Sequence, residues 1–293
     1  MENLKVQSSF RGTNDFGKLF LVPTPIGNLE DMTFRAVNTL SEADLICAED
    51  TRNTLKLLNH FEIKTPMESF HEHNWAEKIP KLLKILKAGQ SIAQVSDAGM
   101  PSISDPGHEL VMVAIEEEIP VVALPGASAG ITALIASGIN PQPHIFYGFL
   151  PRKKSGQVEF FESKKNYPES QIFYESPLRL VETLSNMLTV YGNRQVVLTR
   201  ELTKIYEEYR RGPISELIED LRERPAKGEC ILIVSGATDK DKLEFEGTAL
   251  EEVHDLIVSG EKTNAAIKKV AKLRGLNRQE LYAEFHELKT EAK

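Results

Sequence analysis

Residues 96–107 read SDAGMPSISDPG and directly follow the apolar run 91–95, which is a predicted β-strand. Small residues in such a loop let a ligand lie against main-chain N–H and C=O groups, from which larger side chains would hold it away. Residues 23–29 (PTPIGNL) and 124–129 (LPGASA) have the same character and also follow predicted strands. In open α/β proteins the ligand site lies beyond the carboxyl ends of the strands. The three loops therefore predict an α/β fold with a small-molecule site at one edge of its sheet.

The rest of the chain alternates predicted strands and helices in two series. The strands expected in the first series are 19–22, 43–48, 91–95 and 119–124, and those in the second are 145–149, 170–174, 195–199 and 230–234. Helices are expected to start after Thr33, near Trp75 and at Asp105-Pro106 in the first series, and near residues 156–164, 178–191 and 214–222 in the second. Strands alternating with helices predict two α/β domains.

The domain boundaries follow from changes in composition. Residues 1–16 are polar and lack the apolar stretch of a signal peptide, which predicts a disordered arm. A Pro-rich segment at residues 140–144 separates an N-terminal α/β domain (17–139) from a second one (140–238). Residues 239–293 have a helical pattern and form the expected tail.

Bulk composition limits the classes of protein to consider. With 41% hydrophobic residues and no apolar run near the roughly 20 residues of a membrane span, the chain is expected to be globular and not in a membrane. Cys47 and Cys230 lie in apolar runs and are predicted to be buried, reduced thiols, as in a cytoplasmic protein. The net charge of −8 counts against a protein that binds nucleic acid with its whole surface, so RNA binding would need local basic patches.

Several common motifs are missing from the sequence. There is no G-x-G-x-x-G after the first strand, no phosphate-binding loop of the Walker type and no paired Cys/His spacing for zinc. Asp97 and Asp105 together could hold magnesium, but Asp105 is better explained as a helix N-cap. His71 and His73 are best explained as loop residues. We therefore expect no metal.

Six segments in chain order carry a family resemblance: 23–29 (PTPIGNL), 48–52 (AEDTR), 96–107 (SDAGMPSISDPG), 147–151 (YGFLP), 174–179 (YESPLR) and 200–204 (RELTK). Together they resemble the ribosomal RNA small subunit methyltransferase I family, a branch of the tetrapyrrole-methylase superfamily, from about Leu19 to Gly236. The resemblance implies a bilobal enzyme, usually a homodimer, with S-adenosylmethionine in the cleft between the lobes. It also implies methylation of the 2′-hydroxyl of a cytidine in the decoding region of 16S ribosomal RNA. Met100 departs from the threonine of the family pattern.

Cofactor contacts are expected from both domains. The Asp97 carboxylate could accept hydrogen bonds from ribose hydroxyls or the methionine amino group, with an Asx-turn as the alternative. The helix start at Ser128 could receive a polar part of the ligand, or serve only close helix packing. The resemblance places residues 174–176 on the adenine side, with packing between the lobes as the alternative. The expected contacts are Pro25, Gly27, Asp97, Ala98, Gly99, Ser128, Ala129, Tyr174, Glu175 and Ser176.

A ribose hydroxyl is a weak nucleophile, so a positioned base would help it to react. Asp50 and Glu201 follow predicted strands and are the candidate catalytic residues, with Glu175 behind them. Each carboxylate has a structural alternative. Asp50 could pair with Arg52, and Glu201 with Arg200 or Lys204.

Cations near the predicted strand ends are candidates for RNA contact. They are Arg52, Arg152, Lys153, Lys154, Arg179 and Arg200, with Arg210, Arg211 and the basic helix Lys268–Arg278 as further ones. Two other functions stay open at this point. A methyltransferase of the same fold could act on a small molecule such as a tetrapyrrole, or the protein could be a non-catalytic ribosome-assembly factor.

Overall fold

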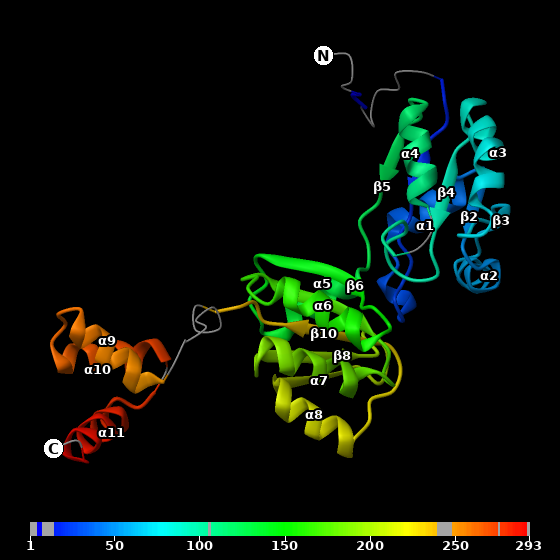
Figure 1. Cartoon of the computed structure of the whole chain (residues 1–293). Helices are drawn as coiled ribbons and strands as arrows, with labels where there is room; N and C mark the ends of the chain where they lie inside the picture. The colour runs from blue at the N-terminus through cyan, green and yellow to red at the C-terminus, as the bar shows by residue number, and fades with distance from the viewer. Residues whose placement is uncertain (1–4, 8–14, 105–106, 239–247, 275, 292–293) are drawn as a thin grey trace.

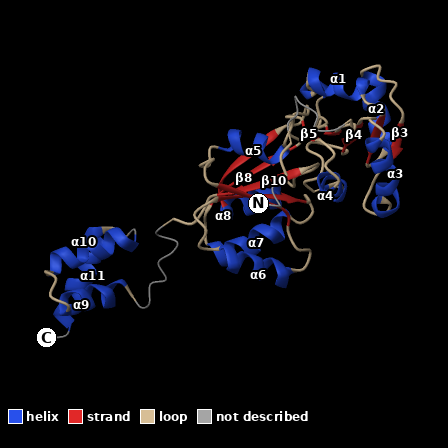
Figure 2. Cartoon of the chain, turned by 90° about the horizontal axis from the view of Figure 1, so that it is seen from above, coloured by secondary structure: helices blue, strands red, loops and turns tan. Residues whose placement is uncertain are grey.

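The computed structural model describes residues 5–7, 15–104, 107–238, 248–274 and 276–291. These residues form two five-stranded sheets, each packed with helices, and a C-terminal group of helices (Figures 1 and 2). The α/β class, the two lobes and the helical C-terminal segment predicted from the sequence are confirmed. Residues 239–247 of the predicted tail lie outside the described residues.

The first sheet is parallel throughout, in the order β3-β2-β4-β1-β5. Its strands are β1 (Leu19–Leu21), β2 (Leu45–Ala48), β3 (Met67–Ser69), β4 (Ile92–Val95) and β5 (Val121–Ala123). A parallel sheet is buried on both faces, and alternate residues of these strands enter two separate cores. Because all strands run the same way, the loops after β1, β2, β4 and β5 meet at one edge.

Helices cover both faces of this sheet. One core joins it to α1 (Phe34–Glu42) and α2 (Thr51–His60), and the other joins it to α3 (Trp75–Lys87) and α4 (His108–Glu116), while η1 (Leu29–Asp31) is a short turn. Thr33 caps α1 as expected, since its Oγ1 accepts a hydrogen bond from Ala36 N at 3.0 Å. The structure begins α4 at His108 with Gly107 as its N-cap, and the expected start at Asp105-Pro106 lies outside the described residues.

The second sheet is mixed, in the order β6-β7-β10-β8-β9. Its strands are β6 (His144–Phe149), β7 (Ser170–Glu175), β8 (Gln195–Arg200), β9 (Glu208–Pro213) and β10 (Cys230–Val234). Only β6 and β7 pair in parallel, and the other neighbours are antiparallel. The sequence analysis missed β3, β9 and α2. The polar β9 has no buried residue, so it lacks the apolar pattern of the other strands.

The two faces of the second sheet are covered differently. Helices α6 (Lys154–Lys164), α7 (Leu180–Tyr191) and α8 (Ile214–Glu223) pack on one face, around Phe161 and Leu232. Of the described helices, α5 (Ala129–Ser137) packs on the opposite face, where its Ala133 and Leu134 are buried with Ile172. Although α5 precedes the expected boundary at residue 140, it contacts β7 and β10 of the second sheet.

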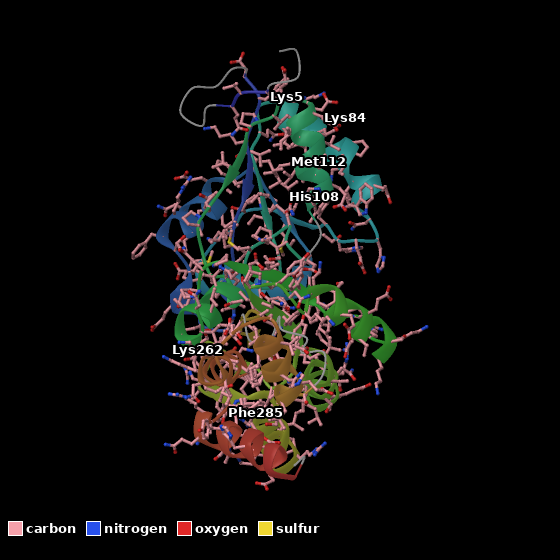
Figure 3. All side chains as sticks on the ribbon, turned by 60° about the vertical axis from the view of Figure 1, so that its left-hand side comes forward. Lys5, Lys84, His108, Met112, Lys262 and Phe285 are labelled. Carbon is pink, nitrogen blue, oxygen red and sulfur yellow. The ribbon has the colours of Figure 1, made fainter. Side chains whose placement is uncertain are left out.

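The last three helices, α9 (Ala249–Val258), α10 (Thr263–Arg274) and α11 (Arg278–Glu291), form a core of their own. Val253 of α9, Ile267 of α10 and Phe285 of α11 are buried in it, and Figure 3 labels Phe285 together with Lys262 at the start of α10. A capping box between Thr248 and Glu251 begins the group.

At the other end of the chain, residues 1–4 and 8–14 of the predicted arm lie outside the described residues. The Lys5 ammonium donates to the carbonyl oxygens of Ile115 and Glu116 at the end of α4 (Figure 3). The Gln7 side chain exchanges two hydrogen bonds of 2.8 Å with the backbone of Val121 in β5. The described part of the arm thus lies along the free edge of the first sheet.

Candidate functional site

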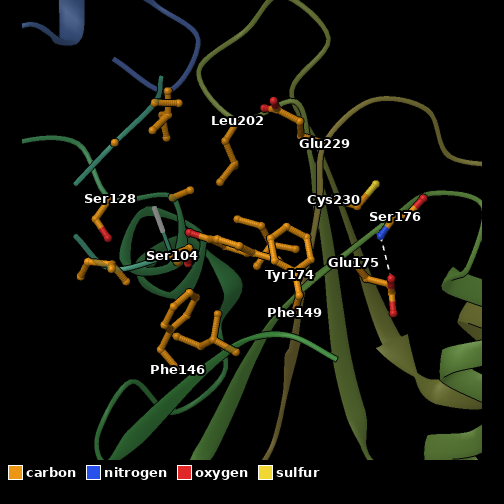
Figure 4. A pocket seen from close by; sticks show the side chains of 18 of the residues that line it. Ser104, Ser128, Phe146, Phe149, Tyr174, Glu175, Ser176, Leu202, Glu229 and Cys230 are labelled. Carbon is orange, nitrogen blue, oxygen red and sulfur yellow. Dashed lines mark hydrogen bonds between the residues drawn. The ribbon is translucent and has the colours of Figure 1, made fainter. Parts of the chain in front are cut away.

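A cavity of about 1260 Å³ lies between the loops of the first sheet and the open face of the second (Figure 4). Residues of both lobes line it, as expected for a cleft site. The predicted residues that line it are Asp97, Ala98, Gly99, Ser128, Ala129, Arg152, Tyr174, Glu175, Ser176 and Arg179. The predicted residues outside its lining are Pro25, Gly27, Asp50, Arg52, Lys153, Lys154, Arg200 and Glu201.

Short backbone contacts hold the loops of the first lobe together. Thr24 and Gly99 exchange two backbone hydrogen bonds of 3.0 Å, and Thr24 Oγ1 donates to Ser96 O at 3.1 Å. Gly99 has a φ of 76°, a left-handed conformation that glycine adopts without cost. A Cβ on Gly126 would lie 2.5 Å from Pro23 Cβ, so only glycine allows the third loop to pack this closely on the first. The small residues therefore keep the loops in contact.

The loop of residues 23–29 contributes Ile26 to the lining instead of Pro25 or Gly27. Gly27 faces the second lobe, because a Cβ placed there would lie 2.6 Å from Lys204 Cγ. This loop therefore bridges the lobes. Its predicted role in shaping the floor of the site stays a prediction for Pro25 and Gly27.

Asp97 is exposed, and its carboxylate is held by the neighbouring loop after β2. Its Oδ1 accepts from Asp50 N at 3.2 Å and its Oδ2 from Asn53 Nδ2 at 3.1 Å. These bonds orient the carboxylate at the cavity and leave lone pairs for a ligand. They connect Asp97 to the start of α2, whereas the Asx-turn alternative would place its bonds within its own loop.

The start of α5 forms one side of the cavity. Ser128 is its N-cap but makes no side-chain capping bond, and the next residues, Ala129 to Ile131, also line the cavity. The first backbone N–H groups of a helix have no partner within the helix, so they can bind a polar ligand group. A Cβ on Gly130 would lie 3.3 Å from the Phe146 ring. The small residues thus also serve helix packing.

The second lobe supplies an aromatic wall made of Phe146, Phe149 and Tyr174. The ring of Tyr174 lies edge-on to Phe146 and to Phe149, with centroids 5.0 and 5.5 Å apart, and Figure 4 shows it inside the cavity. Phe149 lines the cavity and is nonetheless 69% exposed. The sequence analysis missed Phe146 and Phe149, although both lie in the strand that ends in the quoted YGFLP segment.

Glu175 is fully buried and satisfied by protein groups. Ser176 N donates to its Oε1 at 2.8 Å (Figure 4), Thr183 Oγ1 donates to its Oε2 at 2.8 Å, and Arg179 lies 3.5 Å away. Burying a carboxylate is costly unless it is paired and hydrogen-bonded, and here it is both. The geometry favours a role in fixing the turn between β7 and α7.

The two candidate bases, Asp50 and Glu201, both form the ion pairs that were the structural alternatives to catalysis. Asp50 caps α2 and binds Arg52 at 2.7 Å, and the hydrogen bond from the Arg52 side chain lowers the Asp50 pKa to about 2. Glu201 Oε1 accepts from Glu229 N at 2.9 Å and from Lys204 at 3.1 Å, and the bond from Glu229 N lowers its pKa. A low pKa makes a carboxylate a weak proton acceptor. Catalysis by either residue stays a prediction.

The candidate RNA-binding cations fall into two groups. Arg152 and Arg179 line the cavity, and Lys153 and Lys154 are exposed beside them at the start of α6. Arg52 is exposed and paired with Asp50, and Arg200, Arg210 and Arg211 are held by contacts within the protein. Arg200 binds Glu208 at 2.6 Å, Arg210 binds Asp220 at 2.8 Å, and Arg211 donates to the carbonyl oxygens of Ala136 and Ser137.

Cys47 and Cys230 are both buried free thiols, as predicted. Burial raises the pKa of Cys47 to about 12 and that of Cys230 to about 11, and Cys230 also lines the cavity. Within the described ranges, no group of three or more His, Cys, Asp or Glu side chains is arranged to hold a metal ion. None of the described helices is both long and apolar enough to cross a membrane.

Comparison with known proteins identifies the family. The profile of the family described as Tetrapyrrole (Corrin/Porphyrin) Methylases matches residues 18–218, which include the first sheet, strands β6 to β9 of the second and the start of α8. The chain belongs to this family.

Individual relatives agree with this. The chain is 62% identical over 287 residues to the protein of Streptococcus pyogenes serotype M1 named Ribosomal RNA small subunit methyltransferase I, and the match covers 97% of this chain and all of the relative. The Bacillus subtilis (strain 168) protein of the same name is 50% identical over 288 residues, covering 97% of this chain and 99% of the relative. The family resemblance predicted from the six segments is confirmed.

Solved structures of other proteins share the fold at low sequence identity. Diphthine synthase has a TM-score of 0.60 with 12% identity, covering 76% of this chain and 91% of its own. Uroporphyrin-III C-methyl transferase from Thermus thermophilus, complexed with S-adenyl homocysteine, has a TM-score of 0.52 with 18% identity. The match covers 75% of this chain and 97% of that structure's chain. These likenesses show the common bilobal fold.

Proposed function

We propose that this chain methylates the ribose 2′-hydroxyl of a cytidine in the decoding region of 16S ribosomal RNA, with S-adenosylmethionine as methyl donor. The observation that carries the proposal is the cavity, which joins the small-residue loops of the first lobe to the aromatic wall of the second. Its volume exceeds the roughly 300–1000 Å³ that usually holds one small ligand, so it has room for a cofactor and part of a second molecule. The near full-length relatives named for ribosomal RNA support the choice of substrate.

The residues at the cavity fit S-adenosylmethionine. When bound, this cofactor supplies an electrophilic methyl group on a positively charged sulfur. The Asp97 carboxylate would accept hydrogen bonds from the ribose or the amino group, and the backbone N–H groups at the start of α5 would bind the carboxylate. The Tyr174 side of the aromatic wall would pack on the adenine, and carboxylates around the cavity suit the positive sulfur.

The proposed RNA-binding residues lie where the cavity meets solvent. Arg152 and Arg179 line the cavity and would bind phosphates of the target strand, with Lys153 and Lys154 extending the basic surface. This local patch is what a chain of net charge −8 needs in order to bind RNA. Since Arg200 lies outside the lining of the cavity and is paired with Glu208, we assign it a structural role. We also propose a homodimer, supported by exposed apolar side chains such as Phe34 and Leu178, acting in the cytoplasm on the small ribosomal subunit.

The proposal is tested by transfer of a labelled methyl group from S-adenosylmethionine to small subunits from a strain that lacks this enzyme. Wild type should label 16S RNA at one alkali-resistant dinucleotide, and Asp97→Ala should label it at least about tenfold more slowly. The matched control is Asp31→Ala, which removes an exposed carboxylate of the same lobe outside the cavity and should act like wild type. Tight cofactor binding without transfer to RNA would favour a small-molecule acceptor, and no cofactor binding would overturn the enzyme.

A further inference from the structure

A second, smaller hollow of about 480 Å³ adjoins the cavity, and every residue that lines it is polar or charged. It is formed by the loop after β2 with the start of α2, by the end of β3 with the residues after it, and by Ser104. Among its residues are Arg52, whose side chain is 87% exposed, and the loop histidines His71 and His73. The main cavity has an aromatic wall, whereas this hollow has only polar and charged side chains and therefore fits a hydrophilic molecule.

The two spaces meet at Glu49 and Ser104, which line both of them. Glu49 directly follows the buried end of β2, and β2 pairs with β4 so that Ala48 lies beside Val95. This register places Glu49 beside the loop that begins at Ser96 and carries Asp97. Glu49 therefore lies between the polar hollow and the proposed cofactor cavity.

Methyl transfer constrains where the acceptor can bind. The displacement is in line, so the attacking oxygen must approach the methyl group from the side opposite the sulfur. The acceptor must therefore lie in a space continuous with the cofactor cavity. A ribose is hydrophilic, which matches the polar lining of this hollow. Arg52 remains 87% exposed in its ion pair with Asp50 and would meet the phosphate, while the carboxylates Glu49, Asp50 and Glu72 also line the hollow.

We propose that the smaller hollow binds the ribose-phosphate of the acceptor nucleotide, and that Glu49 is the base that takes the proton of its 2′-hydroxyl. This inference rests on the proposed function. As the oxygen–methyl bond forms, the sulfur–methyl bond breaks and its electron pair stays on sulfur, giving a neutral thioether. The hydroxyl proton passes to the Glu49 carboxylate, which later releases it to water. Charge is balanced, because one positive sulfonium and one negative carboxylate become two neutral groups.

Position distinguishes Glu49 from the candidate Asp50. Asp50 lines the smaller hollow but not the main cavity, so its carboxylate does not lie between the two spaces. Its Oδ1 and Oδ2 both accept hydrogen bonds from Arg52, at 2.8 and 2.7 Å for the closest donors. Asp50 orients Arg52 and the start of α2, whereas Glu49 lines both spaces.

The test compares single-turnover methyl transfer by wild type, Glu49→Gln and Glu77→Gln on small subunits lacking the mark, at saturating labelled S-adenosylmethionine. Glu77 is exposed on α3, lines neither space, and loses the same charge when replaced. We expect Glu49→Gln to lower the rate about 100-fold, with cofactor Kd and RNA Kd within about twofold of wild type. Glu77→Gln should match wild type.

Other outcomes of this single-turnover test distinguish failure of the proposed function from failure of the inference about Glu49. If wild type transfers no methyl group to RNA, the proposed function itself fails. If wild type is active and Glu49→Gln is as fast as Glu77→Gln, the inference alone is overturned. A rate loss that follows weakened cofactor binding would also overturn it, because Glu49 would then be a cofactor contact.

Should Glu49→Gln fail to fold in thermal denaturation, Arg52→Ala decides the inference. We expect this variant to weaken RNA binding several-fold and to leave cofactor binding unchanged, as a phosphate contact would. Unchanged affinity for RNA would overturn the assignment of the hollow.

Discussion

The two lobes build one cavity by opposite means. The first lobe presents backbone and small residues, because its parallel strands all end at the same edge and Gly99 and Gly126 let the loops pack closely. The second lobe presents the open face of its sheet, where Phe146 and Tyr174 lie edge to face. The difference teaches that backbone conformation shapes the cavity in the first lobe, whereas side chains shape it in the second. Substitutions should therefore act differently in the two lobes.

The largest expected effect separates the two carboxylates predicted to bind the cofactor. Glu175→Ala in the second lobe removes a buried carboxylate together with its contacts to Thr183 and Arg179, so we expect a loss of about 3 kcal/mol of unfolding free energy. Asp97→Ala in the first lobe, where the side chain is exposed, should cost under about 1 kcal/mol. Urea denaturation measures both. Equal losses of unfolding free energy in the two variants would contradict a structural role for Glu175 and a ligand-facing role for Asp97.

The second effect tests the backbone of the first lobe. Gly99→Val places a β-branched residue at a φ of 76° with its Cβ 3.3 Å from Ile26, which should cost about 2 kcal/mol and weaken cofactor binding at least about tenfold. The matched control is Gly192→Val, at a φ of 72° with no atom within 4 Å of the added Cβ. It should lose stability but keep the cofactor Kd, as measured by calorimetry. Equal loss of cofactor affinity in both variants would argue against a local role of Gly99.

A smaller effect is expected in the aromatic wall. Phe149→Ala removes an edge contact with Tyr174 and an exposed ring surface of the cavity, and should weaken cofactor binding by about 1 kcal/mol, or about fivefold. Phe34→Ala, on the exposed side of α1, removes the same ring away from the cavity and should leave the Kd unchanged. Calorimetric titration of both variants provides the measurement. If the cofactor Kd changed in Phe34→Ala and not in Phe149→Ala, the aromatic wall would not be a cofactor contact.

The smallest effect concerns pH. The folded pKa of Asp50 is lowered to about 2 by the bond from Arg52, below the unfolded value of about 3.9, so its stabilising contribution is present above pH 4 and is lost as pH falls towards 2. Asp50→Asn keeps a capping side chain but cannot titrate. The difference in unfolding free energy between wild type and this variant should shrink as pH falls from 5 to below 3. A difference that stays constant would show that Asp50 does not titrate as the structure indicates.

Much of the fold could be predicted from local sequence. Apolar runs followed by small residues predicted β1, β4 and β5 with their loops, and capping at Thr33 predicted the start of α1. The prediction failed where the pattern was not local. β9 is a polar edge strand held by pairing with β8. The sequence predicted Arg200 of β8 to contact RNA, but in the structure Arg200 lies opposite Glu208 of β9 and pairs with it.

The sequence by itself determined where the cavity at the first sheet lies, because the carboxyl ends of parallel strands must meet at one edge and small residues mark the loops there. Only the tertiary structure decided which side chains reach it. Whether a carboxylate is buried like Glu175, paired like Asp50 or placed between two spaces like Glu49 depends on residues distant in the chain. Burial and ion pairing are properties of the packed neighbours, and no local pattern encodes them.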